Sequence, residues 1–121
     1  MSPTEHLHRA LGGLPGVELT RSRFGASGRP AWRVAGREFA HLHADDLLDL
    51  RLPRAVQARL KADPLAHFRA SRSEWLEFEF HTEADVRHVV ALAREAWAAA
   101  STPARRDATN LQPTTPAQRT P

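Results

Sequence analysis

The stretch Trp75-Leu76-Glu77-Phe78-Glu79-Phe80, followed after one histidine by Thr82-Glu83-Ala84-Asp85, decides the fold. In its first part, apolar residues hold the even positions and polar or aromatic residues hold the odd ones, which is typical of a strand with one buried face. In its second part, Thr82 and the acidic Asp85 have the spacing of a capping box at a helix start. The stretch therefore predicts a half-buried strand leading into a helix that continues to about residue 100.

The same two patterns recur along the preceding part of the chain. Helices are predicted over residues 4–14 and 53–62, and strands over 17–24, 31–34, 37–43 and 47–52. Since most of these strands have a single apolar face, we expect helices to pack against one side of the sheet only. The predicted fold is α+β: a two-layer single domain over residues 1–100, with a mainly antiparallel sheet of about five strands. The predicted element order is α-β-β-β-β-α-β-α.

The composition is that of an ordinary globular domain. The chain has 121 residues, of which 41% are hydrophobic and 26% charged, and this suits one domain with one core. No apolar run approaches the roughly 18 residues needed to cross a bilayer, and no secretory signal is visible, so we expect a cytoplasmic protein without a membrane partner. The absence of cysteine excludes disulfides, thiolate catalysis and cysteine-ligated metals.

The charge pattern does not favour nucleic acid as a partner. The net charge is +3, and acidic residues interleave with scattered arginines, whereas a nucleic-acid binder gathers its basic residues into a patch. From residue 101 the composition changes, with four prolines and five threonines over residues 101–121. Such a segment buries too little apolar surface to offset its ordering entropy, so we expect a disordered tail.

A pair of histidines marks the candidate site. His41 and His43 lie two residues apart in a predicted strand, so their side chains are expected on one face. Ala40 and Leu42 suit the helix side, which sends Phe39 and both histidines to the opposite face. The alternation of the neighbouring strands sends further polar and aromatic residues to that face, namely Asp49, Arg51, Trp75, Glu77 and Glu79. His67 is close enough in the chain to reach the same surface.

Aromatic walls with a few polar groups are typical of a small-molecule site. Three interpretations stay open at this point. The face is a solvated sheet surface, which is polar in any protein. The His-x-His pair with a carboxylate binds Zn or non-haem Fe. A histidine transfers a proton or orients a ligand.

Several short motifs also resemble one family in their order and spacing. Arg37-Glu38-Phe39-Ala40-His41-Leu42-His43 resembles the Arg-Glu-Ile-Ala-His-Met-His segment of the fungal luciferases that oxidise 3-hydroxyhispidin. Leu48-Asp49-Leu50-Arg51-Leu52 is similar to a Leu-His-Leu-Ala-Leu strand there. His67, Glu74-Trp75 and Phe78 follow in the matching order. Bacterial members of this luciferase domain family, which tend to read Gly-His-Leu-His, are more similar still.

The resemblance covers roughly Trp32 to Trp97, and it departs from the family at a few positions. Asp49 stands where the fungal enzymes have histidine, and Glu77 and Glu79 have no evident counterparts. A second likeness, in topology more than in sequence, is to the small α+β YjbR-like domains. The resemblance to the luciferase family implies its fold and a polar pocket, and it does not imply light emission.

The residues and the resemblance together predict a function. We expect a domain that binds a small aromatic or enol-type molecule and oxidises it without metal or cofactor. His41 or His43 would take a proton, and Arg37 or Arg51 would stabilise the negative charge. The residues expected to bind the ligand are Phe39, Asp49, Arg51, His67, Trp75 and Glu77. The alternative is a non-catalytic interaction module, a homodimer for example, with Phe39 and Trp75 as anchors.

Overall fold

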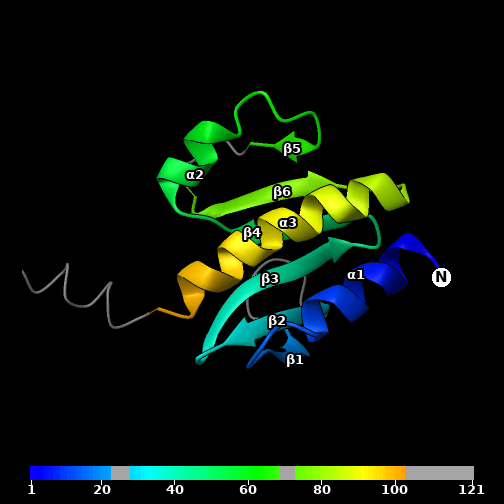
Figure 1. Cartoon of the computed structure of the whole chain (residues 1–121), viewed down its shortest axis with the longest axis vertical. Helices are drawn as coiled ribbons and strands as arrows, with labels where there is room; N and C mark the ends of the chain where they lie inside the picture. The colour runs from blue at the N-terminus through cyan, green and yellow to red at the C-terminus, as the bar shows by residue number, and fades with distance from the viewer. Residues whose placement is uncertain (23–27, 69–72, 103–121) are drawn as a thin grey trace, which may run out of the picture.

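The computed structural model describes residues 1–22, 28–68 and 73–102. Its elements, in chain order, are α1 (Pro3–Gly12), β1 (Glu18–Arg21), β2 (Pro30–Val34), β3 (Arg37–Ala44), β4 (Leu47–Arg51), α2 (Arg54–Arg59), β5 (Ala66–His67), β6 (Trp75–Glu79) and α3 (Glu83–Ala100) (Figure 1). Every predicted element is present, and the two-residue strand β5 is the addition. The strands form one antiparallel sheet in the order β1-β2-β3-β4-β6-β5.

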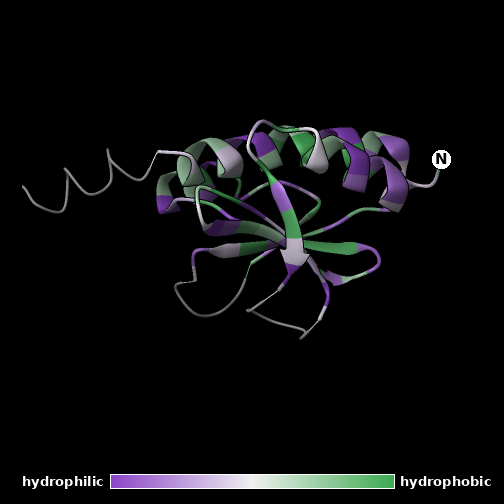
Figure 2. Cartoon of the chain, turned by 90° about the horizontal axis from the view of Figure 1, so that it is seen from below, coloured by the Kyte–Doolittle hydropathy of each residue, from purple (hydrophilic) through white to green (hydrophobic). Residues whose placement is uncertain are grey.

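The helices lie together on one side of this sheet (Figure 2). Helix α3 packs against β2, β3 and β4, and α1 packs against α3. Leu48, Leu50 and Phe78 point to this side, where they are fully buried with Val86 and Val89 of α3. The predicted two-layer α+β fold is therefore confirmed. The other side of the sheet is called the outer face below.

The helix starts follow from local chemistry. The Thr82 side chain accepts a hydrogen bond from the Asp85 backbone N–H, and the Asp85 carboxylate accepts one from the Thr82 backbone N–H. This is the capping box that the sequence predicts. Ser2 and Glu5 make the same reciprocal pair at the start of α1. Each cap satisfies backbone N–H groups that have no partner within the helix.

Two irregularities in β3 set which residues reach the outer face. Against β2, Ala40 pairs with Trp32 and Glu38 pairs with Arg33, so Phe39 is an extra residue in a β-bulge. Against β4, Leu42 pairs with Leu48 and Ala44 pairs with Leu47, which leaves His43 as a second extra residue. A bulge shifts the alternation of side chains by one position.

The first bulge corrects the predicted placement of Phe39 and separates the candidate residue Arg37 from the histidines. Phe39 was expected on the outer face, but it is fully buried in the hydrophobic core. Arg37 pairs with Val34, a core residue, and directly opposed residues share a face, so Arg37 lies on the helix side as well. The shift turns Glu38 to the outer face instead.

The described residues bear only in part on two further expectations, the disordered tail and the lack of a membrane-spanning segment. Of the predicted tail over residues 101–121, only Ser101 and Thr102 are described, and Ser101 caps the end of α3. The remainder, 103–121, lies outside the described residues. Within the described ranges, none of the helices has the length and apolar character needed to cross a membrane.

Candidate functional site

A row of directly opposed residues crosses the outer face. His41 of β3 pairs with Asp49 of β4, Asp49 pairs with Glu77 of β6, and Glu77 pairs with His67 of β5. Arg51 and Trp75 form the next pair on the same face. Directly opposed side chains project to the same side of a sheet. The structure therefore brings these six predicted residues to one surface.

His41 is the buried centre of this row. Its side chain is 2% exposed, its Nδ1 lies 2.9 Å from Glu38 Oε2, and its Nε2 lies 2.9 Å from Asp49 Oδ2. The Ser22 hydroxyl donates to the same Glu38 oxygen at 3.0 Å. Glu38 Oε2 therefore has two polar neighbours, the Ser22 hydroxyl and His41 Nδ1. The His41 ring therefore bridges the Glu38 and Asp49 carboxyl groups, with one ring nitrogen toward each.

This arrangement defines what His41 can do. A buried charge is tolerated when it is paired and hydrogen-bonded, and here one imidazole joins two buried carboxylates. Both ring nitrogens are occupied by these contacts. His41 is therefore held in place by its neighbours and does not meet an incoming molecule first.

His43 is the exposed member of the pair. Its side chain is 42% exposed, and its Nδ1 lies 4.0 Å from Asp49 Oδ2, the same oxygen that contacts His41. The second bulge places it beside Ala44 at the outer edge of the site. Among the described residues, His43 Nε2 has no hydrogen-bond partner. Asp49 therefore links a buried histidine to one that a ligand can reach.

Trp75 forms an aromatic wall beside the histidines. Its ring centroid lies 4.5 Å from that of His41, with the two planes tilted by 49°. The guanidinium of Arg51 lies 5.7 Å from the Trp75 ring centroid, within the range of a cation–π contact. Arg51 Nε also donates to Glu74 at 2.9 Å. Trp75 itself is half-buried.

Glu38 is the site residue that the sequence reasoning missed, together with its partner Ser22. Strict alternation from Arg37 to His43 assigns Glu38 to the core and Phe39 to the outer face. That assignment puts a carboxylate where a phenyl ring belongs, and this conflict is the signal of a bulge in the strand. The predicted Arg37 and Phe39 are absent from the outer face because of the same bulge.

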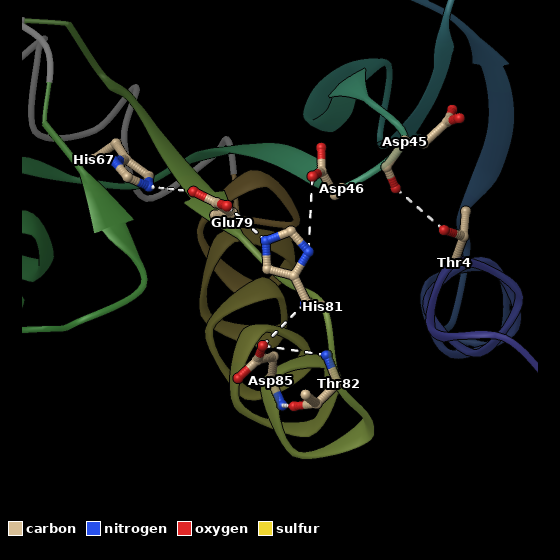
Figure 3. Close-up of polar contacts among 8 residues, drawn as sticks. All are labelled: Thr4, Asp45, Asp46, His67, Glu79, His81, Thr82 and Asp85. Atoms are coloured by element: carbon tan, nitrogen blue, oxygen red, sulfur yellow. Dashed lines mark hydrogen bonds and ion pairs between the residues drawn. The ribbon is translucent and has the colours of Figure 1, made fainter.

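A second polar cluster lies at the rim of the sheet, where β6 ends (Figure 3). One carboxylate oxygen of Glu79 lies 3.1 Å from His67 Nε2, and the other lies 2.5 Å from His81 Nε2. His81 Nδ1 lies 3.7 Å from Asp46 Oδ2. An open depression of about 500 Å³ adjoins this cluster and is lined in part by Thr4, Asp46 and His81. The depression lies at the rim and does not include His43.

Two groups of described residues have the composition of a metal site. In one, the ligand atoms of His43, Asp49 and Glu77 lie within 4.8 Å of one another, and in the other the same holds for Asp46, Glu79 and His81. Nitrogen and carboxylate donors suit Zn, Mn and Fe.

The rim cluster shifts the acidity of its members. The hydrogen bond from His81 lowers the pKa of Glu79 below its ordinary value of 4.5. The same bond, followed by the charges of Glu79, Asp46 and Asp85, raises the pKa of His81 above 6.5. Both shifts favour the charged forms, because each partner stabilises the charge of the other.

These shifts predict the pH range over which the His81–Glu79 pair stabilises the fold when no metal ion is bound. The contribution of His81 to stability is present below pH 6.5 and is lost as the pH rises through its folded-state pKa. The contribution of Glu79 is present above pH 4.5 and is lost as the pH falls through its folded-state pKa. NMR titration of the His81 ring is expected to give a midpoint above 6.5 that Glu79→Gln lowers. An unchanged midpoint in that variant would contradict the assignment, and His8→Gln serves as a control that leaves it in place.

The comparisons with known proteins agree with the motifs in β3, β4 and β6. The model of the luciferase domain family matches residues 36–96, about half of the chain, from the turn before β3 to the last part of α3. The match includes both histidines, Asp49 and Trp75. No curated protein matches the chain. The family predicted from the sequence is thereby confirmed, and the chain belongs to the luciferase domain family.

Proposed function

We propose that the outer face binds a small aromatic or enol-type molecule and that His43 takes a proton from it. One observation carries the proposal: an exposed histidine lies 4.0 Å from Asp49, the carboxyl group that contacts the buried His41. A base must be accessible to its substrate and must be oriented by a neighbouring group. His43 has the access, and Asp49 orients it once the 4.0 Å contact between them shortens in the ligand complex.

Trp75 and Arg51 are the residues proposed to position the ligand. A flat ring stacks against the half-buried Trp75, and the Arg51 guanidinium beside that ring stabilises negative charge on the ligand oxygen. Glu77 and His67 continue the row beyond Asp49 and would contact polar substituents. Arg37 has no part in this scheme because it lies on the helix side.

The reaction then needs only the ligand and O2. His43 removes the enol O–H proton, and the electron pair of the resulting enolate becomes available at carbon. That carbon transfers electrons to O2 and forms a C–O bond, giving a peroxide anion. The anion takes back the proton from His43, so one ligand and one O2 yield one hydroperoxide. The step requires neither a metal nor an organic cofactor.

Anaerobic calorimetry tests the binding part of the proposal. With 3-hydroxyhispidin as the probe, Trp75→Leu is expected to weaken binding at least about tenfold, a loss of ~1.4 kcal/mol. The matched control is Trp97→Leu. Trp97 belongs to α3, on the helix side of the sheet, where its indole N–H donates to Pro15 O, so it is away from the outer face. Equal affinity in the two variants would contradict the proposal. A wild-type chain that dimerises and binds no probe would favour the interaction module instead.

A further inference from the structure

The rim cluster is built from segments that are distant in the sequence. Asp46 lies in the turn between β3 and β4, Glu79 ends β6, and His81 follows it (Figure 3). The Phe80 backbone N–H donates to Asp46 O at 3.0 Å, which fixes the turn against the end of β6. The backbone therefore holds Asp46 and His81 in position independently of their side chains.

The geometry around His81 favours positive charge at this point. Both of its ring nitrogens face carboxylate oxygens, Nε2 toward Glu79 and Nδ1 toward Asp46. In the ion pairs among the described residues, the partners of these two carboxylates are histidines, with no arginine or lysine. A metal ion that takes the place of the His81 proton would keep both carboxylates paired with positive charge.

The donor set indicates which cation fits. One imidazole nitrogen and two carboxylate oxygens lie within 4.8 Å of one another, and a bound ion requires the side chains to turn toward it. His67 contacts the other oxygen of Glu79 and adds a second nitrogen nearby. Mg²⁺ and Ca²⁺ prefer all-oxygen sites, whereas histidine favours Zn²⁺, Co²⁺ and related ions. The adjoining depression leaves room for water ligands.

We propose that Asp46, Glu79 and His81 bind a divalent transition-metal ion that clamps the β3–β4 turn to the end of β6. The three ligands are not those of the proposed chemistry on the outer face, which uses His43, Asp49 and Trp75, although His67 lies beside both sites. The ion replaces the contacts that His81 makes with the two carboxylates. Its binding is therefore expected to raise thermal stability without being required for folding.

Calorimetric titration of the chelator-treated full chain with Zn²⁺ tests the proposal. Wild type is expected to bind one ion, and His81→Asn and Glu79→Gln are each expected to weaken binding at least about tenfold. His43→Asn is the matched control, because it removes a ligand of the other candidate group and is expected to change the affinity less than about twofold. His88→Asn controls for an exposed histidine paired with one carboxylate, Asp63.

A second measurement locates the ion without any substitution. Titration with paramagnetic Co²⁺ is expected to broaden the NMR signals of Asp46, Glu79 and His81 before those of His43 and Glu77. No binding of Zn²⁺ by wild type would overturn the proposal. It would also be overturned if His43→Asn lost the affinity that His81→Asn kept. Since neither result depends on the enol-type ligand, failure here leaves the proposed function of the outer face intact.

Discussion

His41→Ala is expected to lower the free energy of unfolding by about 3–5 kcal/mol, whereas His43→Ala changes it by less than about 0.5 kcal/mol. The two histidines are neighbours in the sequence motif, yet they differ in environment. Removal of the His41 ring leaves the Glu38 and Asp49 carboxylates facing each other in a buried space. Removal of the His43 ring affects only an exposed side chain at 4.0 Å from Asp49. Urea unfolding followed by circular dichroism measures both values.

The comparison has an internal check. If burial of the two carboxylates causes the loss, then Glu38→Gln in the His41→Ala background is expected to recover part of it, because one of the facing charges is removed. The same Glu38→Gln change in wild type replaces the carboxyl partner of His41 and Ser22 by an amide and is expected to destabilise. Equal urea midpoints for His41→Ala and His43→Ala would show that the Glu38–His41–Asp49 group does not contribute to stability.

The parts of the fold that the sequence predicts are those in which local pattern and tertiary environment agree. In β6, Leu76 and Phe78 lie in the hydrophobic core while Glu77 faces outward, so alternation identifies both the strand and its buried side. The start of α3 is equally local, because Thr82 and Asp85 satisfy each other's backbone groups without help from the rest of the chain. These features need no knowledge of strand pairing.

The parts that the sequence does not predict depend on pairing between strands. The bulge at Phe39 exists because β2 and β3 pair with one residue more on β3, and this register is set by both strands and the turn between them. Its consequence is a site with Glu38 in it and without Phe39. β5 was missed because two residues carry no periodicity, although Ala66 and His67 both pair with β6.

The rim cluster illustrates the same limit at the level of side chains. Glu79 was placed on the outer face by alternation, but its neighbours come from other segments. His81 reaches it from the following turn, and Asp46 is brought near by the backbone hydrogen bond from Phe80. Sequence spacing contains no information on that docking. The cluster is therefore a product of the fold, in contrast to the histidine pair.

The distinction between the two histidines also sets the expected effect on catalysis. With 3-hydroxyhispidin and O2, His43→Ala is expected to lower kcat by about 10²–10⁴-fold, the range for loss of a general base. Binding is expected to change little, because the proposal assigns the ligand contacts to Trp75 and Arg51. Oxygen consumption measures kcat, and anaerobic calorimetry measures binding. Unchanged kcat in this variant would remove His43 from the proposed mechanism.

Added imidazole separates a direct role of His43 from an indirect one. The His43 side chain is 42% exposed, so its removal opens a space that free imidazole can enter from solvent. Imidazole in that space can accept the enol proton, and millimolar imidazole is expected to restore part of the kcat of His43→Ala. The His41 ring is 2% exposed, so imidazole is not expected to rescue His41→Ala. Rescue of His41→Ala but not of His43→Ala would assign the base to His41 and would require the buried group to open during turnover.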